Sequence, residues 1–196
     1  MPGDPEWPAT WDTYAALLPH AEIGLSAESQ GMRQIASYLG ASGNRSAARA
    51  LLRQIVSASE QVLGSEHPGT LMARASLARW TGESGDSAAA RDQLALLIPV
   101  MERALGADHP QTVTHRGTLA SWTGHAGDAA AARDQLAALL PIADRVLGPE
   151  HSGTLAARAN HARWTGLPGI LLRPATSSPL WCRESSRSWG QSIPRP

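Results

Sequence analysis

The sequence contains no lysine and no phenylalanine, and it has a single cysteine, Cys182. One cysteine excludes an intramolecular disulfide framework and a cysteine-rich zinc site, and it favours a reducing compartment. No segment approaches the run of about 18 apolar residues that spans a membrane, and the opening MPGDPEWPATW lacks a secretory signal. We therefore expect a cytoplasmic protein without a membrane partner. Seventeen basic residues balance seventeen acidic ones, so the net charge of zero favours no nucleic-acid partner.

The main feature of the sequence is a repeat of 42 residues. The stretch HPGTLMARASLARWTGESGDSAAARDQLALLIPVMERALGAD begins at His67 and recurs from His109, with 24 of the 42 positions identical. A third copy opens at His151, and a more diverged copy precedes His67. Such a period predicts stacked supersecondary units. The predicted organisation is a lead-in helix over 1–25, a diverged first repeat over 26–66, complete repeats over 67–108 and 109–150, the first helix of a fourth repeat over 151–166, and a tail over 167–196.

The sequence of each complete repeat predicts two helices. The first runs from about 68 to 81, because Pro68 suits the first helical position and Gly82 suits a left-handed C-terminal cap. The second opens at Asp86, whose carboxylate can accept from free N–H groups of the first turn. Pro99 lies inside this second helix and predicts a bend, because proline removes a backbone hydrogen bond.

The spacing of small and apolar residues resembles a known family. The pair Leu77 and Ala78, followed by Gly85, Ala90 and the trailing LG-x-x-HP, is similar to tetratricopeptide repeats of the 42-residue kinesin-light-chain type. The resemblance implies an all-α fold, a helical-hairpin solenoid forming a right-handed superhelix of about 3.5 repeats. Arginines stand at three positions where the family favours a large aromatic, namely Arg74, Arg116 and Arg158.

Two phrases, ARWTG and AARDQLAALLP, are similar to repeats attached to actinobacterial signalling ATPases of the NB-ARC class. The chain has no G-x-x-x-x-G-K-[ST] loop, so it carries no such ATPase itself. The resemblance implies a non-catalytic protein–protein interaction module, a fragment of the sensor array of a larger regulatory protein.

The first helices of such a solenoid would line a concave groove. The arginines of this groove would favour a protein or peptide partner with acidic side chains, because guanidinium groups fork onto carboxylates. The alternative is that these arginines only solvate a surface. The candidate groove residues are Gln30, Arg33, Ser37, Met72, Arg79, Thr114, Ser121 and Arg163, interleaved with the small residues Ala75, Gly117, Ala156 and Ala159.

The tryptophans and the histidines that recur with the repeat can each be interpreted as structural or as functional. Trp80, Trp122 and Trp164 fit packing between repeats, although an aromatic ladder can also stack bases. The histidines that open the repeats fit turns, because residues a full repeat apart cannot share one zinc ion. We therefore predict no catalytic, cofactor or metal site. A cryptic hydrolase and an RNA-binding helical solenoid are the alternative functions. His161 replaces the leucine of the earlier repeats, and we interpret it as tolerated decay at a core position.

The tail breaks the repeat abruptly after Gly166. It carries five prolines and no helical period, so we predict disorder. When the tail is written in GC-rich codons and translated again from two nucleotides later, the new translation includes AGDPAAARDQFAALVP. This translation matches the missing second helix of the fourth repeat, so we interpret residues 167–196 as frameshifted. The helix from about 153 to 165 then lacks a cover over Leu155 and Ala162. Uncapped solenoid ends associate, and we predict self-association through this end.

Overall fold

The computed structural model describes residues 30–166, and this part of the chain consists of helices joined by short turns. The predicted all-α class is confirmed. None of the described helices is long and apolar enough to cross a membrane. The predicted lead-in helix over 1–25 and the tail over 167–196 lie outside the described residues. The helices are α2 (Gln30–Ala41), α3 (Arg45–Leu63), α4 (Pro68–Glu83), α5 (Ser87–Leu105), α6 (Pro110–His125), α7 (Ala129–Val146) and α8 (Ser152–Trp164).

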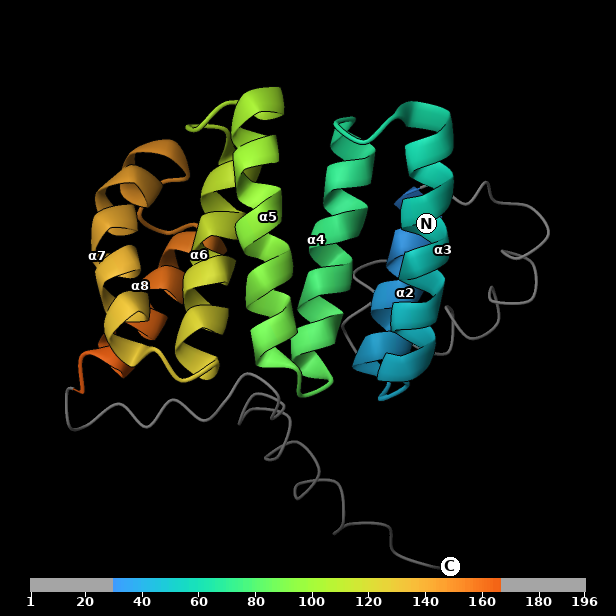
Figure 1. Ribbon diagram of the computed structural model, residues 1–196. Helices are drawn as coiled ribbons and strands as arrows, with labels where there is room; N and C mark the ends of the chain where they lie inside the picture. Colours follow the sequence, from blue (N-terminus) through green and yellow to red (C-terminus); the bar gives the residue numbers. More distant parts are fainter. Residues whose placement is uncertain (1–29, 167–196) are drawn as a thin grey trace, which may run out of the picture.

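The helices stand side by side as a solenoid (Figure 1). The array runs from α2 and α3 at one end to α8, drawn in orange, at the other. Each helix packs against the next one along the chain, and α2, α4, α6 and α8 also contact one another in sequence. These four are the first helices of their repeats, so one side of the array is built from first helices alone.

Histidine and aspartate side chains cap the helix starts. The histidines that open the repeats were predicted only to form turns, whereas their imidazoles are the N-caps of α4, α6 and α8. Asp86 accepts from the backbone N–H of Ala89 at 3.0 Å, which confirms its predicted capping role. The imidazole Nδ1 atoms accept from the backbone two residues on, His67 from Gly69 at 3.1 Å, His109 from Gln111 at 3.2 Å and His151 from Gly153 at 3.0 Å.

The predicted role of Gly82 is wrong. Helix α4 continues to Glu83, and the left-handed residue after it is Gly85, with φ of 103°. Gly82 is buried within the helix, and a Cβ atom there would lie 2.6 Å from the indole of Trp122. The same contact joins Gly40 to Trp80 and Gly124 to Trp164. Each tryptophan therefore packs onto a glycine of the preceding first helix, which confirms the inter-repeat packing of these rings.

The core lies between first and second helices. Leu71, Ala75 and Ala78 on one side of α4 are buried against α5. Ala73, on another side of α4, packs in a cluster with α2 and α3. Each first helix of the interior thus has two apolar sides, one for the preceding second helix and one for the following one. The α5 partners of the first side are Leu94, Leu97, Ile98 and Met101.

Candidate functional site

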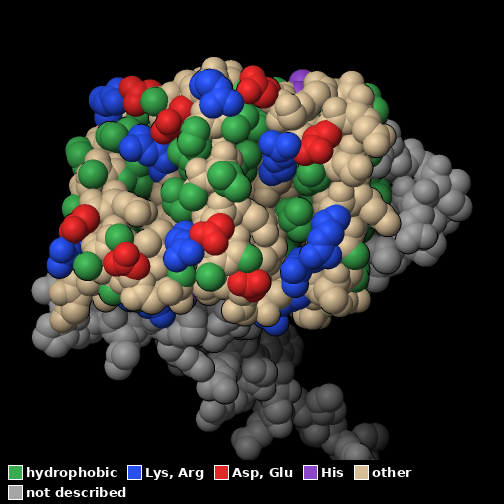
Figure 2. Space-filling view, viewed as in Figure 1, with side chains coloured by type: hydrophobic (Ala, Val, Ile, Leu, Met, Phe, Trp, Pro, Cys, Tyr) green, Lys and Arg blue, Asp and Glu red, His purple; other side chains and the backbone are tan. Residues whose placement is uncertain are grey.

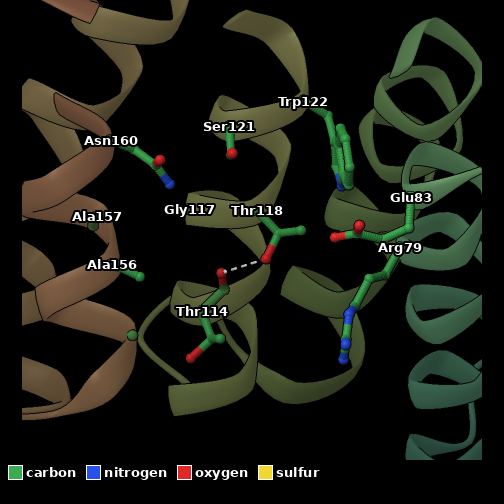
Figure 3. Close-up of a pocket in the computed structure, with 11 residues that line it drawn as sticks. Arg79, Glu83, Thr114, Gly117, Thr118, Ser121, Trp122, Ala156, Ala157 and Asn160 are labelled. Carbon is green, nitrogen blue, oxygen red and sulfur yellow. Dashed lines mark hydrogen bonds between the residues drawn. The ribbon is translucent and has the colours of Figure 1, made fainter. Parts of the chain in front are cut away.

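A cleft of about 200 Å³ opens on the side built from first helices. Helix α6 lies in its middle, with α4 on one side and α8 on the other (Figure 3). Three consecutive repeats therefore contribute to one site. Its lining residues are Arg79 and Glu83 from α4, Thr114, Gly117, Thr118, Ser121 and Trp122 from α6, and Gly153, Ala156, Ala157 and Asn160 from α8.

Small residues keep the cleft open. Gly117 has no side chain, and a Cβ atom there would reach only Leu139, at 3.4 Å. Ala156 and Gly153 present minimal side chains from α8. Because helical solenoids bring first helices close together, larger residues at these positions would fill the space between α6 and α8. The cleft thus has room for a ligand side chain or an extended backbone.

Two polar side chains in the cleft retain their hydrogen-bonding capacity. The Thr118 hydroxyl donates to the Thr114 carbonyl at 3.2 Å, and the Thr114 hydroxyl donates to the Pro110 carbonyl at 2.9 Å. Within residues 30–166, neither the Ser121 hydroxyl nor the Asn160 amide has a hydrogen-bond partner. A hydroxyl and an amide can each donate and accept, so these groups suit the peptide bonds of a ligand.

The charges of the cleft are balanced. Arg79 places its guanidinium 4.7 Å from the ring centroid of Trp80, and Glu83 follows it one helical turn later. Both side chains lie on the α4 edge of the cleft (Figure 3). On the face seen in Figure 2, arginine and acidic side chains are likewise interspersed. Neither the cleft nor this face presents a field of a single sign.

The structure brings only part of the predicted groove together. Arg79, Thr114 and Ser121 line the cleft, as do the interleaved Gly117 and Ala156. The other predicted groove residues lie elsewhere on the array.

Helix α2, outside the cleft, carries Gln30, Arg33 and Ser37, and burial lowers the pKa of the Arg33 guanidinium. Met72 packs against the core between α4 and α5. Arg163 lies 5.5 Å from the ring centroid of Trp164, and its Nη1 is 3.3 Å from Nε2 of His125. The three predicted groove arginines are therefore not neighbours in one site.

Glu83, Thr118, Trp122 and Asn160 also line the cleft and were not among the predicted groove residues. The prediction used one fixed set of positions in every repeat, whereas α4 contributes residues near its C-terminal end and α8 contributes residues between 153 and 160. The superhelical rotation between repeats produces this shift. Helical spacing alone could have added Thr118, because it lies four residues after Thr114 on the same face.

Across residues 30–166, no group of three or more histidine, cysteine and acidic side chains is placed to hold a metal ion. His161 is half-buried, and so are Leu77 and Leu119 at the same repeat position. Leu77 and Leu119 pack against hydrophobic core clusters, so this position lies at the edge of the core, and His161 places a polar ring there.

Comparison with known proteins agrees with this geometry. Residues 27–102 match the tetratricopeptide repeat family. Comparison with curated protein sequences finds no match. Two solved structures of Podosopora anserina kinesin-light-chain "nearly identical TPR-like repeats", one of them a point variant, are each 24% identical to this chain. They superpose with TM-scores of 0.62 and 0.61, over 80% of this chain and 76% of theirs.

The fold and the cleft define a helical-repeat scaffold, a class that generally serves protein interaction and not catalysis. Residues 27–102 are similar to tetratricopeptide repeats, and the described helices share the fold of the two kinesin-light-chain-like repeat structures.

Proposed function

We propose that the array binds a segment of a partner protein in the cleft between α4, α6 and α8. The proposal rests on one observation: Ser121 and Asn160, from neighbouring repeats, both line a cleft that Gly117 keeps open. A peptide backbone in this cleft would exchange hydrogen bonds with both side chains, and its apolar side chains would contact Ala156.

Selection of displayed random-sequence peptides against the full chain tests this proposal. Selected peptides should lose binding to the variants Ala156→Trp and Ser121→Tyr, which fill the cleft. The matched control is Ala138→Trp, which adds the same bulk at an exposed position of α7. If the selected peptides bind all three variants equally, the cleft is not the binding site.

The preference for acidic peptides stays a prediction of this proposal. Arg79 in the cleft favours a carboxylate, whereas Glu83 next to it opposes one. We expect Arg79→Ala to weaken the binding of an acidic peptide and Glu83→Ala to strengthen it, since each removes one charge from the site. The combined change of Arg33, Arg79 and Arg163 to alanine should weaken it no more than Arg79→Ala does, because only Arg79 of the three lines the cleft. Equal affinity for acidic and basic peptides would exclude the preference.

The wider setting of the module is also a proposal. The ARWTG and AARDQLAALLP phrases support an origin in the sensor array of a larger cytoplasmic regulatory protein of the ATPase-linked kind, shortened by the frameshift. Sequencing the genomic DNA on both sides of this frame tests it, because an upstream nucleotide-binding domain supports the sensor array and its absence supports a free-standing adaptor. Self-association is proposed to occur through the side of α8 that carries Leu155 and Ala162, called its open side, which no other described helix covers.

A further inference from the structure

The carboxylate of Glu83 has no partner in the described part of the chain. Glu83 is half-buried at the α4 edge of the cleft, and within residues 30–166 its carboxylate takes part in no hydrogen bond or ion pair. It is also the last residue of α4, where the helix dipole disfavours a negative charge. Helices α2 and α6 end in Ala41 and His125 at the same repeat position, so the repeated fold does not account for this carboxylate.

The threonine hydroxyls of the cleft can only accept hydrogen bonds from a ligand. Thr118 donates its hydroxyl hydrogen to the Thr114 carbonyl at 3.2 Å, and Thr114 donates its own to the Pro110 carbonyl at 2.9 Å. A hydroxyl has one hydrogen to donate, so each oxygen can only accept from a ligand. The Glu83 carboxylate points from α4 toward Thr118 (Figure 3). Three acceptor-only groups, on α4 and α6, therefore line the same cleft.

The donors of the cleft do not offset these acceptors. The Ser121 hydroxyl and the Asn160 amide can each donate and accept, so they suit either kind of ligand group. Arg79 is the only basic residue among the described residues that line the cleft. Its guanidinium lies 4.7 Å from the ring centroid of Trp80 and points away from the Glu83 carboxylate (Figure 3). The group that complements the cleft is therefore rich in donors and positively charged.

The size of the cleft limits this group to one side chain. Its volume of about 200 Å³ is below the ~300 Å³ at which pockets for drug-sized ligands begin. A guanidinium is a planar cation with five N–H donors and no acceptor, so it can serve a carboxylate and neutral oxygens at once. A carboxylate of the ligand would instead meet the like charge of Glu83 and two hydroxyl oxygens that cannot donate to it.

From these observations we infer that the cleft is a subsite for an arginine side chain of the bound segment. Glu83 accepts from the guanidinium, and the Thr118 hydroxyl accepts a further N–H. The inference rests on the proposed function, because it names the side chain that the segment inserts between α4, α6 and α8. An acidic residue of the same segment can still face Arg79, so the two preferences concern different positions of the ligand.

Three synthetic peptides that differ in one side chain test the inference. The probes are acetylated and amidated peptides of the sequences SGARASG, SGAQASG and SGAEASG, titrated into the isotope-labelled full chain and followed by nuclear magnetic resonance. We expect the arginine peptide to bind about tenfold more tightly than the glutamine peptide, because it adds charge-assisted hydrogen bonds. The glutamate peptide should bind most weakly. Shifts of the Asn160 side-chain amide signals would locate each peptide in the cleft.

Variants of the full chain assign the preference to Glu83. Glu83→Gln keeps the size of the side chain and removes its charge, so the arginine and glutamine peptides should bind this variant equally. The matched control is Glu102→Gln, which removes a half-buried glutamate from α5, outside the cleft, and should retain the preference. Thr118→Val removes one acceptor with little change of shape and should reduce the preference for arginine over glutamate.

The outcomes separate this inference from the proposed function. Equal binding of the arginine and glutamine peptides to the wild type, with both lost in the cleft-filling variant Ser121→Tyr, would refute the arginine subsite and leave the proposed function intact. A preference for arginine that persists in Glu83→Gln would also refute it. If the arginine peptide does not bind the wild type at all, the inference fails, and the selection of displayed peptides decides the proposed function separately.

Discussion

Helices α6 and α8 start in the same way and differ in what surrounds them. Both follow a histidine N-cap, and both carry an apolar residue at the fourth helical position, Val113 and Leu155. Helix α6 lies between α5 and α7, whereas α8 contacts α7 and α6 and has no following helix in the described chain. Val113 is consequently buried and Leu155 half-exposed.

The difference shows that a side chain at a given repeat position is buried only where a neighbouring helix covers it. In a solenoid, stability is approximately the sum of terms within repeats and between adjacent repeats. The same side chain should therefore contribute very differently in the interior and at the end of the array. Three predictions, from the largest effect to the smallest, test or sharpen this comparison.

The same substitution at one repeat position should have unequal effects. Leu71→Ala removes a fully buried side chain and should lower the free energy of unfolding by about 2–5 kcal/mol, because it leaves a cavity. Leu155→Ala should lower it by about 1 kcal/mol or less, because the side chain already meets solvent. Urea denaturation followed by circular dichroism measures both. Equal losses would show that the open side of α8 is covered in solution.

Two glycines of α6 should respond in opposite directions to alanine. In Gly124→Ala the new methyl group would overlap the indole of Trp164, and overpacking of this kind costs about 1–3 kcal/mol. In Gly117→Ala the methyl group meets Leu139 at an ordinary 3.4 Å, and the helix gains about 0.5–1 kcal/mol in propensity. Thermal unfolding should therefore shift down for the first variant and stay or rise for the second. A neutral Gly124→Ala would mean that Trp164 does not hold α8 against α6.

His115 should give α6 a small dependence on pH. Burial lowers the pKa of this imidazole from its ordinary value of 6.5, while a hydrogen bond with the Gln111 carbonyl raises it in part. Because the folded state binds the proton more weakly than the unfolded state, His115 destabilises the fold as the pH falls from about 6.5 toward the lowered pKa. Above pH 6.5 the imidazole is neutral in both states, and this effect vanishes.

His115→Ala tests this dependence, since alanine occupies the same repeat position in α4 and α8. The denaturation midpoint of this variant should fall less between pH 7.5 and pH 5 than that of the wild type. Parallel midpoints over this range would show that the imidazole does not titrate differently on folding.

The repeat period made most of the fold predictable. Identical residues 42 positions apart mark the same place in successive hairpins, so the helix pairs and the Asp86 cap follow from the sequence alone. Gly82 was misassigned because glycine near a helix end usually indicates a cap. Its actual partner, Trp122, lies in the next repeat, and a local pattern does not reveal which residue of one repeat meets which residue of another.

The site was less predictable than the fold. Thr114 and Ser121 could be placed in the cleft because they share one face of α6. Arg163 and Met72 could not be excluded from it, because the rotation between repeats decides which half of each first helix reaches the cleft. Glu83 was missed for the same reason, and its charge changes the expected basic character of the groove.

Hydrogen exchange resolved along the chain tests the central claim, that neighbouring helices and not repeat position determine burial and stability. Amides in α6, which has a second helix on each side, should exchange only through large unfolding events, whereas those in α8 should exchange markedly faster through local opening. Equal protection of α6 and α8 in the full chain would contradict the account.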